Sequence, residues 1–317
     1  MSFILLSHWH GRFGNRMHQY AYGATYNKLT GSQFVLPSDW EGTKLFKNQF
    51  HIVSENDELR HQLNQSHPAH HTRNALIKKV KDIYPNSFLI NPEQAPYNYA
   101  KYLDPVFFDS VCAYGSDVYS KMSKNFLLEV FEFSDEVKNT EAYKYWSNKQ
   151  GTYDVAHLRR GDISDVNYNK NNTQGYSVIS KDSYFNAFEK FNFDKNKILW
   201  ISDDDKNLWH LDRPKIENFG WRYPEGSNYR PGLMFDWLED FLKIYFARTV
   251  FRANSSFSWW ACFLSKTAKT YSPVIDKRLI YGVDGLEEIN VNFIEGNRPH
   301  WMYNLDGIKY IDIPGEN

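Results

Sequence analysis

Residues 153–165 read YDVAHLRRGDISD, in which a short apolar run leads directly into two arginines and an aspartate. The run at 153–158 predicts a strand that is buried on both faces, as in parallel sheets. The charged residues then fall at the carboxyl end of that strand. In open parallel sheets, ligands bind outside the carboxyl ends of the strands. The stretch therefore indicates a ligand-binding position in an α/β domain.

The second half of the chain alternates between strands and helices. Further strands are predicted at 197–202, 249–253 and 269–274. Helices are predicted at 180–191, with Ser180 as N-cap, at 232–248 and at 256–266. The apolar stripe of the first helix comprises Tyr184, Phe185, Phe188 and Phe191, and that of the second comprises Met234, Trp237, Leu238, Phe241 and Tyr245. This alternation predicts a doubly wound α/β domain.

The first half opens in the same way. A strand at 3–7, a glycine-containing loop at 8–16, a helix ending near Gly31 and a strand at 33–37 form a β-α-β unit. The helix carries Met17, Tyr20, Ala21 and Ala24 on one face. The loop, which contains GRFGN, is either a tight turn before the helix or a backbone loop that faces a ligand.

Length and turn signals predict two domains. A chain of 317 residues is longer than a typical single domain. The polar stretch 147–154 is the best boundary. We therefore expect an N-terminal domain over 1–150 and a C-terminal domain over 151–317. Within the first, 76–84 and 126–138 are expected to be helical or mixed.

Composition restricts the class of protein. Lys and Arg total 37 against 38 Asp and Glu, a formal net charge of −1, which disfavours a nucleic-acid partner. Two cysteines fit a reducing compartment. The sequence shows neither a signal peptide nor a stretch of about 20 apolar residues. We expect a soluble cytoplasmic protein without a membrane span. Aromatic residues, 17% of the chain, indicate a dense aromatic core or stacking surfaces for sugars or bases.

Polar clusters follow three of the predicted strands, at His157–Asp162, Ser202–Asp205 and Asn254–Ser258. Because the carboxyl ends of parallel strands meet at one edge of a sheet, these clusters are expected to form a single site.

Two of the clusters are suited to anions. The planar arginine fork binds phosphate oxygens in pairs, although an Arg pair beside an Asp also forms salt-bridged corners. The serines at 255–258 could simply cap a helix, but a helix N-terminus also binds phosphate. Two such devices on neighbouring strand ends suggest a diphosphate between them.

The remaining cluster, Ser202–Asp205, leaves several alternatives open. It is a solvated acidic turn, an Asp-x-Asp metal site at Asp203 and Asp205, or a carboxylate that pairs with a guanine base or a ribose. The five histidines at 8, 10, 67, 70 and 71 have no convincing metal-ligand spacing and are expected at the surface.

In combination, GRFGNRMHQYAYG, HLRRGD, SDDD and ANSSFSWWACFLS resemble the α-1,2-fucosyltransferases (glycosyltransferase family 11). The GRFGN loop is also similar to that of the protein O-fucosyltransferases. The resemblance covers about residues 4–30 and most of 153–266. It implies an α/β fold of two Rossmann-like domains that face a cleft (GT-B type), with GDP-fucose in the C-terminal domain and the acceptor on the 1–150 side.

Carried over position by position, the resemblance assigns roles to individual residues. It implies that Arg159 contacts the diphosphate, His157 and Asp204 lie by the nucleoside, the serines in 255–258 contact phosphate, and Asn15 reaches the donor from the first domain. No metal and no cofactor are implied beyond GDP-fucose as donor substrate. The full implied donor set is Gly14, Asn15, His157, Arg159, Arg160, Asp204, Asn254, Ser255, Ser256 and Ser258.

The expected reaction transfers L-fucose from GDP-fucose to a hydroxyl of a glycan acceptor with inversion, and an α-1,2 link is the expected product. Negative charge grows on the departing GDP, and without a metal, Arg159 and the helix N-terminus must stabilise it. Inversion also requires a base, for which Asp162 and Asp165 are the candidates. Asp162 is expected rather to orient the arginines, so the base stays open.

Other functions fit the same motifs. They are a transferase of the same build that uses another GDP-sugar, a non-catalytic glycan- or nucleotide-binding protein, and an unrelated phosphate-binding α/β enzyme. The sequence leaves the oligomeric state open.

Overall fold

In the computed structural model the described residues form two compact units, one up to Lys138 and one from Asn139 onward. The predicted boundary at residue 150 places α8 (Glu141–Asn148) in the first domain. In the structure, this helix packs on α11 (Leu238–Tyr245) of the second unit, where Trp146 Nε1 donates to Glu239 Oε1 at 3.3 Å. The residues that the structure describes are 3–6, 12–36, 40–51, 78, 81–82, 85, 88–90, 106–108, 122–159, 178–202, 235, 237–274 and 288–298.

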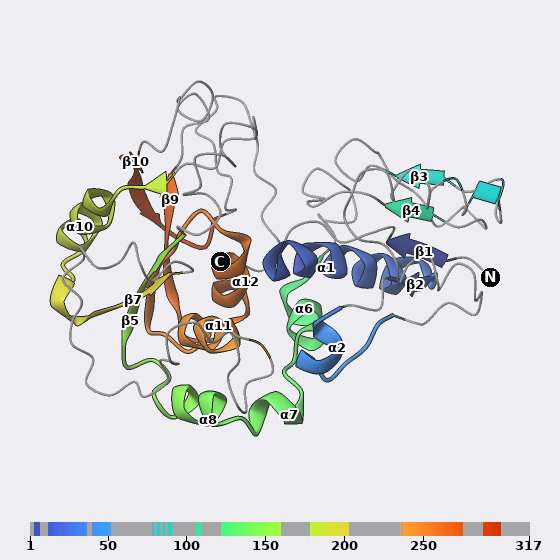
Figure 1. Cartoon of the computed structure of the whole chain (residues 1–317), viewed down its shortest axis with the longest axis horizontal. Coiled ribbons are helices and arrows are strands. Elements are labelled where there is room, and N and C mark those ends of the chain that lie inside the picture. Colours follow the sequence, from blue (N-terminus) through green and yellow to red (C-terminus); the bar gives the residue numbers. More distant parts are fainter. Residues whose placement is uncertain are drawn as a thin grey trace, which may run out of the picture. The chain divides into compact units, whose positions relative to one another are not determined.

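The first unit is built on a four-stranded sheet in the order β2-β1-β4-β3, in which every pair is parallel. Among the described residues, one helix follows each of the first two strands, and two more helices come just before the unit boundary (Figure 1). The strands are β1 (Phe3–Leu6), β2 (Gln33–Val35), β3 (Phe88–Ile90) and β4 (Val106–Phe108). The helices are α1 (Phe13–Thr30), α2 (Gly42–Leu45), α6 (Lys124–Val130) and α7 (Asp135–Lys138).

The predicted β-α-β opening is confirmed, with one correction. Helix α1 ends at Gly31, which caps it in the left-handed conformation (φ 71°) that glycine adopts without strain. It begins at Phe13 and not after Arg16. Gly14 and Asn15 therefore belong to the first helical turn and not to a loop.

Helix α1 lies unusually close to β2 at Gly23. A Cβ added at this position would lie 2.2 Å from the ring of Phe34, which is itself completely buried. Such a distance is far below van der Waals contact, so the helix can pack this closely only because position 23 has no side chain.

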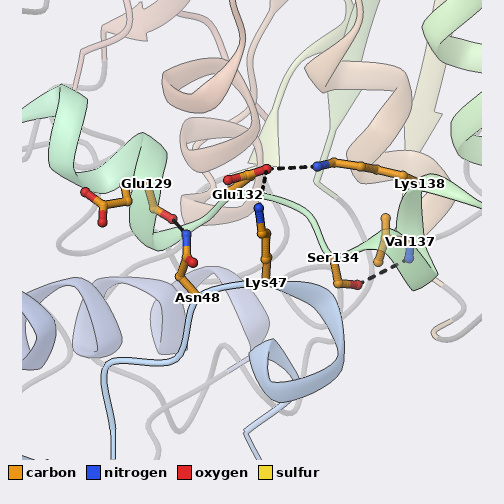
Figure 2. Close-up of polar contacts among 7 residues, drawn as sticks. All are labelled: Lys47, Asn48, Glu129, Glu132, Ser134, Val137 and Lys138. Atoms are coloured by element: carbon orange, nitrogen blue, oxygen red, sulfur yellow. Dashed lines mark hydrogen bonds and ion pairs between the residues drawn. The ribbon is translucent and has the colours of Figure 1, made fainter.

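A polar cluster ties the end of the first unit to the segment after α2. Figure 2 shows Glu132 between Lys138 (2.9 Å) and Lys47 (3.9 Å), and Asn48 Nδ2 donating to the carbonyl of Glu129 at 2.8 Å. The main chain of Lys47 also donates to the carbonyl of Glu132. Because the lysines are partly exposed, the ion pairs add little stability. The main-chain contacts set the register.

Burial makes His18 in α1 sensitive to acid. Desolvation lowers the pKa of His18 from 6.5 to about 3. Below pH 6.5 the unfolded chain therefore binds a proton that the folded protein does not, and stability falls as the pH decreases. The expected slope is about 1.4 kcal/mol per pH unit, or about 2 kcal/mol lost at pH 5 relative to neutral pH.

Denaturant unfolding of the wild type and of His18→Gln between pH 5 and 8 measures this contribution. Glutamine keeps a polar side chain but does not titrate, so its profile should be flatter below pH 6.5. Parallel profiles for the two proteins would contradict the assignment.

The second unit is built on a five-stranded sheet in the order β11-β9-β8-β5-β7 and a two-stranded parallel sheet of β10 and β6. All pairs of the large sheet are parallel except β11 with β9, which is antiparallel. The strands are β5 (Asp154–Leu158), β6 (Val178–Ile179), β7 (Ile198–Ser202), β8 (Thr249–Phe251), β9 (Lys269–Val274), β10 (Glu288–Ile289) and β11 (Asn292–Glu295).

Helices cover both faces of this sheet, with α10 on one side and α11 and α12 on the other (Figure 1). Besides α8 and α11, the helices among the described residues of the unit are α10 (Lys181–Lys190), α12 (Ser256–Leu264) and the 3₁₀ turn η3 (Lys195–Lys197). The side chain of Ser180 caps α10 as predicted. Helix α11 is shorter than predicted and begins at Leu238, and Met234 lies outside the described residues.

An aromatic core joins α10 to the sheet. The ring of Phe188 meets that of Phe251 edge-on at 4.7 Å, and Phe251 stacks on Tyr271 at 4.8 Å. Ala156 and Leu158 of β5 belong to the same cluster. Because side chains alternate along a strand, His157 points to the opposite face, where its ring lies 6.0 Å from Phe257 of α12.

The parallel sheet of the first unit and the mainly parallel sheet of the second, each with flanking helices, confirm the predicted α/β class and its doubly wound form in the second half of the chain. The antiparallel edge strand β11 was not predicted. That the two units face each other across a cleft stays a prediction.

Candidate functional site

The sheet of the second unit reverses its direction of winding between β5 and β8. From β5 the chain passes through α10 to β7 on one side, and from β8 it passes through α12 to β9 on the other. The loops that leave β5 and β8 therefore diverge, and such a topological switch point is where open α/β sheets bind ligands.

Two of the predicted clusters meet at this switch point. Arg159 follows β5 directly, and its Nη1 donates to the main-chain carbonyl of Asn254 at 3.3 Å. Asn254 lies between β8 and α12. The contact holds the half-buried guanidinium beside the amino end of α12. This hydrogen bond uses one N–H group of the guanidinium, which has five N–H donors in total.

The amino end of α12 is capped by its own serines. Ser255 Oγ accepts from the amide of Phe257 at 3.3 Å, which confirms the N-cap interpretation of this serine. The hydroxyl of the fully buried Ser258 donates to the carbonyl of Ser255 at 3.2 Å. Both hydroxyls thus serve the first turn of the helix. Its positive dipole end and the amides of this turn are the features suited to an anion.

Asn254 has an unsatisfied polar atom. Its side chain is about nine-tenths buried, and its Oδ1 has no hydrogen-bond partner among the described residues. A buried amide oxygen without a partner costs free energy, so proteins rarely keep one without a reason. We expect the environment of this amide to change when the site is filled.

His157 is held on both sides. Its carbonyl accepts a hydrogen bond from the hydroxyl of Tyr184 at 2.8 Å, and its ring packs near Phe257. Phe257 is in turn surrounded edge-on by Trp237 at 5.9 Å and Phe241 at 5.3 Å. An aromatic group therefore lies directly beside the α12 amino end.

One charged residue at the site was not predicted. Arg252 follows β8, is completely buried, and donates from Nε and Nη2 to Ser272 Oγ at 3.3 and 3.1 Å. Its Nη2 also donates to the carbonyl of Arg298. Arg252 lies two residues before Asn254, and its hydrogen bonds connect β8 to β9 and to the segment after β11. Within the apolar run TVFRA, no sequence signal separates it from an ordinary strand residue.

The structure thus brings together, at one end of the second unit, six of the predicted residues. Those at or beside the switch point are His157, Arg159, Asn254, Ser255 and Ser256, with Ser258 one turn into the helix. The predicted residues Arg160, Asp162, Asp165 and Asp204 lie outside the described residues.

Gly14 and Asn15 lie in the first unit. They belong to the first turn of α1, where Arg12 stands at the N-cap without a side-chain capping bond and no acidic residue is present. Gly14 is buried and Asn15 is half-buried. This helix end has the same favourable dipole as that of α12.

The described part of the chain contains no group of three or more His, Cys, Asp or Glu side chains arranged to hold a metal ion. Asp203 and Asp205, the alternative metal ligands, lie outside it. None of its helices combines the length and hydropathy that crossing a bilayer requires.

No protein-family model matches the sequence, and no curated protein matches it. Solved structures with some similarity are fucosyltransferases. NodZ α-1,6-fucosyltransferase, soaked with GDP-fucose, is 13% identical over 93% of this chain and 99% of its own, with a TM-score of 0.47. Fucosyltransferase NodZ from Bradyrhizobium is 12% identical over 93% of this chain and 99% of its own, with a TM-score of 0.46.

Two further structures carry GDP. POFUT1 in complex with GDP is 11% identical over 85% of this chain and 96% of its own, with a TM-score of 0.44. A mutant of Arabidopsis thaliana FUT1 in complex with GDP is 9% identical over 85% of this chain and 70% of its own, with a TM-score of 0.43. With scores below 0.5, these likenesses assign neither a reaction nor a substrate to this chain.

Proposed function

We propose that the protein is a fucosyltransferase that moves L-fucose from GDP-fucose to a hydroxyl of a glycan, with inversion and with an α-1,2 link as product. The observation that carries the proposal is the contact between Arg159 and Asn254 at the switch point. It combines a guanidinium and a helix amino end at the edge where α/β sheets bind ligands. This combination suits a diphosphate.

The choice of GDP-fucose is supported by the motifs in the sequence. HLRRGD, SDDD and ANSSFSWWACFLS, with GRFGN before them, resemble the α-1,2-fucosyltransferases. In the proposal, Arg159 and the α12 amino end hold the diphosphate, His157 and Asp204 lie by the nucleoside, and Arg160 assists Arg159. Residues 1–150 provide the acceptor side, with Gly14 and Asn15 reaching the donor.

The reaction needs charge stabilisation and a base. The acceptor oxygen bonds to the anomeric carbon while the bond from that carbon to the phosphate oxygen breaks, and the acceptor proton passes to a base. The negative charge on the departing GDP is then met by Arg159 and by the amides of α12. Asp162 and Asp165 are the proposed candidates for the base.

Thermal stabilisation by nucleotides tests the donor. We expect GDP and GDP-fucose to raise the melting temperature, and UDP and ADP to leave it unchanged. A ligand that binds only the folded state, at about 100 times its dissociation constant, stabilises by about 2.7 kcal/mol. EDTA should change neither the shift nor the transfer activity.

Each alternative has its own outcome in this experiment. A shift with UDP alone would overturn the guanosine assignment. A strict requirement for Mg²⁺ or Mn²⁺ would favour the Asp-x-Asp metal site at Asp203 and Asp205. Tight GDP binding without release of GDP from GDP-fucose in the presence of glycan acceptors would indicate a non-catalytic binding protein.

A further inference from the structure

We infer that Tyr184 is a positioning residue of the diphosphate site, because its hydroxyl fixes the strand end from which Arg159 is presented. The inference rests on the proposed function, since it concerns the same site. Tyr184 does not belong to any of the motifs and lies on α10, the helix on the opposite face of the sheet from α12.

The hydroxyl of Tyr184 bonds to the strand at the point where its support from β8 ends. The pairing of β5 with β8 stops at Ala156, whereas its pairing with β7 continues to Leu158. The carbonyl of His157, one residue beyond the last pair with β8, accepts the Tyr184 hydroxyl at 2.8 Å. A side chain thus secures the main chain past the end of the ladder.

Tyr184 is itself rigidly held. Its side chain is fully buried, with Trp200 at 5.7 Å and Phe293 at 5.0 Å between ring centroids. Ser180 at the N-cap of its helix bonds to Asn290 beside β10. A buried ring packed on two sides has little rotamer freedom, so the position of its hydroxyl is well defined.

The strand end in turn directs the arginine. Arg159 lies two residues after His157, and the fork must meet the ligand within a fraction of an ångström for paired hydrogen bonds. Its contact with the Asn254 carbonyl, at 3.3 Å, is long for a hydrogen bond, and the arginine main chain continues directly from β5, so the direction of the strand end contributes to the orientation of the guanidinium. A small displacement of His157 therefore misaligns the fork.

The chain offers a matched control at the other end of the same strand. Tyr153, directly before β5, donates its hydroxyl to the carbonyl of Lys243, also at 2.8 Å. Tyr184→Phe and Tyr153→Phe each remove one hydroxyl that bonds to a main-chain carbonyl. Both variants should lose a similar amount of stability, but only Tyr184→Phe should affect the site.

Titration with pyrophosphate and with GDP, followed by calorimetry, tests this difference. We expect Tyr184→Phe to bind both ligands about five-fold more weakly. This factor corresponds to the loss of about one hydrogen bond between the misaligned Arg159 and the ligand. Tyr153→Phe should bind both like the wild type. If both variants bind like the wild type, or if both lose the same affinity, the hydroxyl of Tyr184 has a purely structural role and the inference is overturned.

Repeating the Tyr184→Phe substitution in an Arg159→Lys variant shows whether Tyr184 affects ligand affinity by way of Arg159. Arg159→Lys keeps the charge but removes the fork. Adding Tyr184→Phe to this variant should change affinity less than about two-fold, because the geometry that the tyrosine fixes is already lost. An undiminished five-fold effect would contradict transmission through Arg159.

The two ligands separate this inference from the proposed function. If the wild type binds pyrophosphate but not GDP, the fucosyltransferase proposal fails, while the role of Tyr184 is still decided by pyrophosphate. If GDP binds and Tyr184→Phe has no effect, only the present inference fails. Binding of neither ligand would overturn both.

Discussion

Replacing Arg159 by alanine is expected to abolish nearly all transfer, by about 10²–10³-fold in kcat, while the protein stays folded. The guanidinium is half-buried, and its hydrogen bond to the Asn254 carbonyl is long. Truncation of a partly exposed side chain costs less stability than truncation in the core, so the variant should stay folded. In the proposed site, loss of the guanidinium leaves the departing diphosphate with the α12 amides and Arg160, without the fork of Arg159. Release of GDP from GDP-fucose in the presence of acceptor, with the melting temperature measured in parallel, gives both results.

Arg248 supplies the control for this experiment, because it directly precedes β8 and pairs with Asp154 at the start of β5, the end of that strand opposite to Arg159. It binds the buried carboxylate of Asp154 through two hydrogen bonds, of 3.0 and 2.5 Å. Arg248→Ala should lower the melting temperature, since it leaves a buried carboxylate without this partner, and should keep transfer. Wild-type turnover in Arg159→Ala would exclude the assignment of the site.

Replacing Gly23 by alanine is expected to destabilise the first unit by about 2 kcal/mol, since a contact this short belongs at the upper end of overpacking costs. The added methyl group would lie 2.2 Å from the buried ring of Phe34, and overpacking of a core costs about 1–3 kcal/mol and sometimes more. The gain in helix propensity, about 1 kcal/mol for Gly to Ala, offsets only part of this cost. Chemical denaturation of both proteins measures the difference.

The destabilisation by Gly23→Ala should disappear when the ring of Phe34 is replaced by a smaller side chain. In a Phe34→Leu background the methyl group has room, so Gly23→Ala should become neutral or stabilising by up to about 1 kcal/mol, the propensity term alone. The same destabilisation in both backgrounds would show that the close approach to Phe34 is not its cause.

Local patterns predicted much of the second unit correctly. The strand at 153–158, the cap at Ser180, the strand at 269–274 and the helix after Ser255 were each predicted within one or two residues. Apolar runs, N-cap residues and period-3.6 stripes depend on neighbours in the chain, so the sequence contains them directly.

Other features depend on neighbours in space. The start of α1 was predicted too late, because GRFGN has the composition of a turn although Gly14 and Asn15 are helical. Arg252 was indistinguishable from a strand residue, since its partner Ser272 lies twenty residues further on. The contribution of α8 to the second unit follows from the bond between Trp146 and Glu239, 93 residues apart.

The sequence by itself determined that this protein is α/β, that charged and hydroxyl side chains follow its strands, and that Ser255 starts a helix. Only the tertiary structure decided that Arg159 meets Asn254 and that the hydroxyl of Tyr184 bonds to the carbonyl of His157 near the end of β5. The physical reason is the order of the strands. Which strand ends are neighbours is fixed by how helices pack on both faces of the sheet, and that packing joins residues about 30 to 95 positions apart.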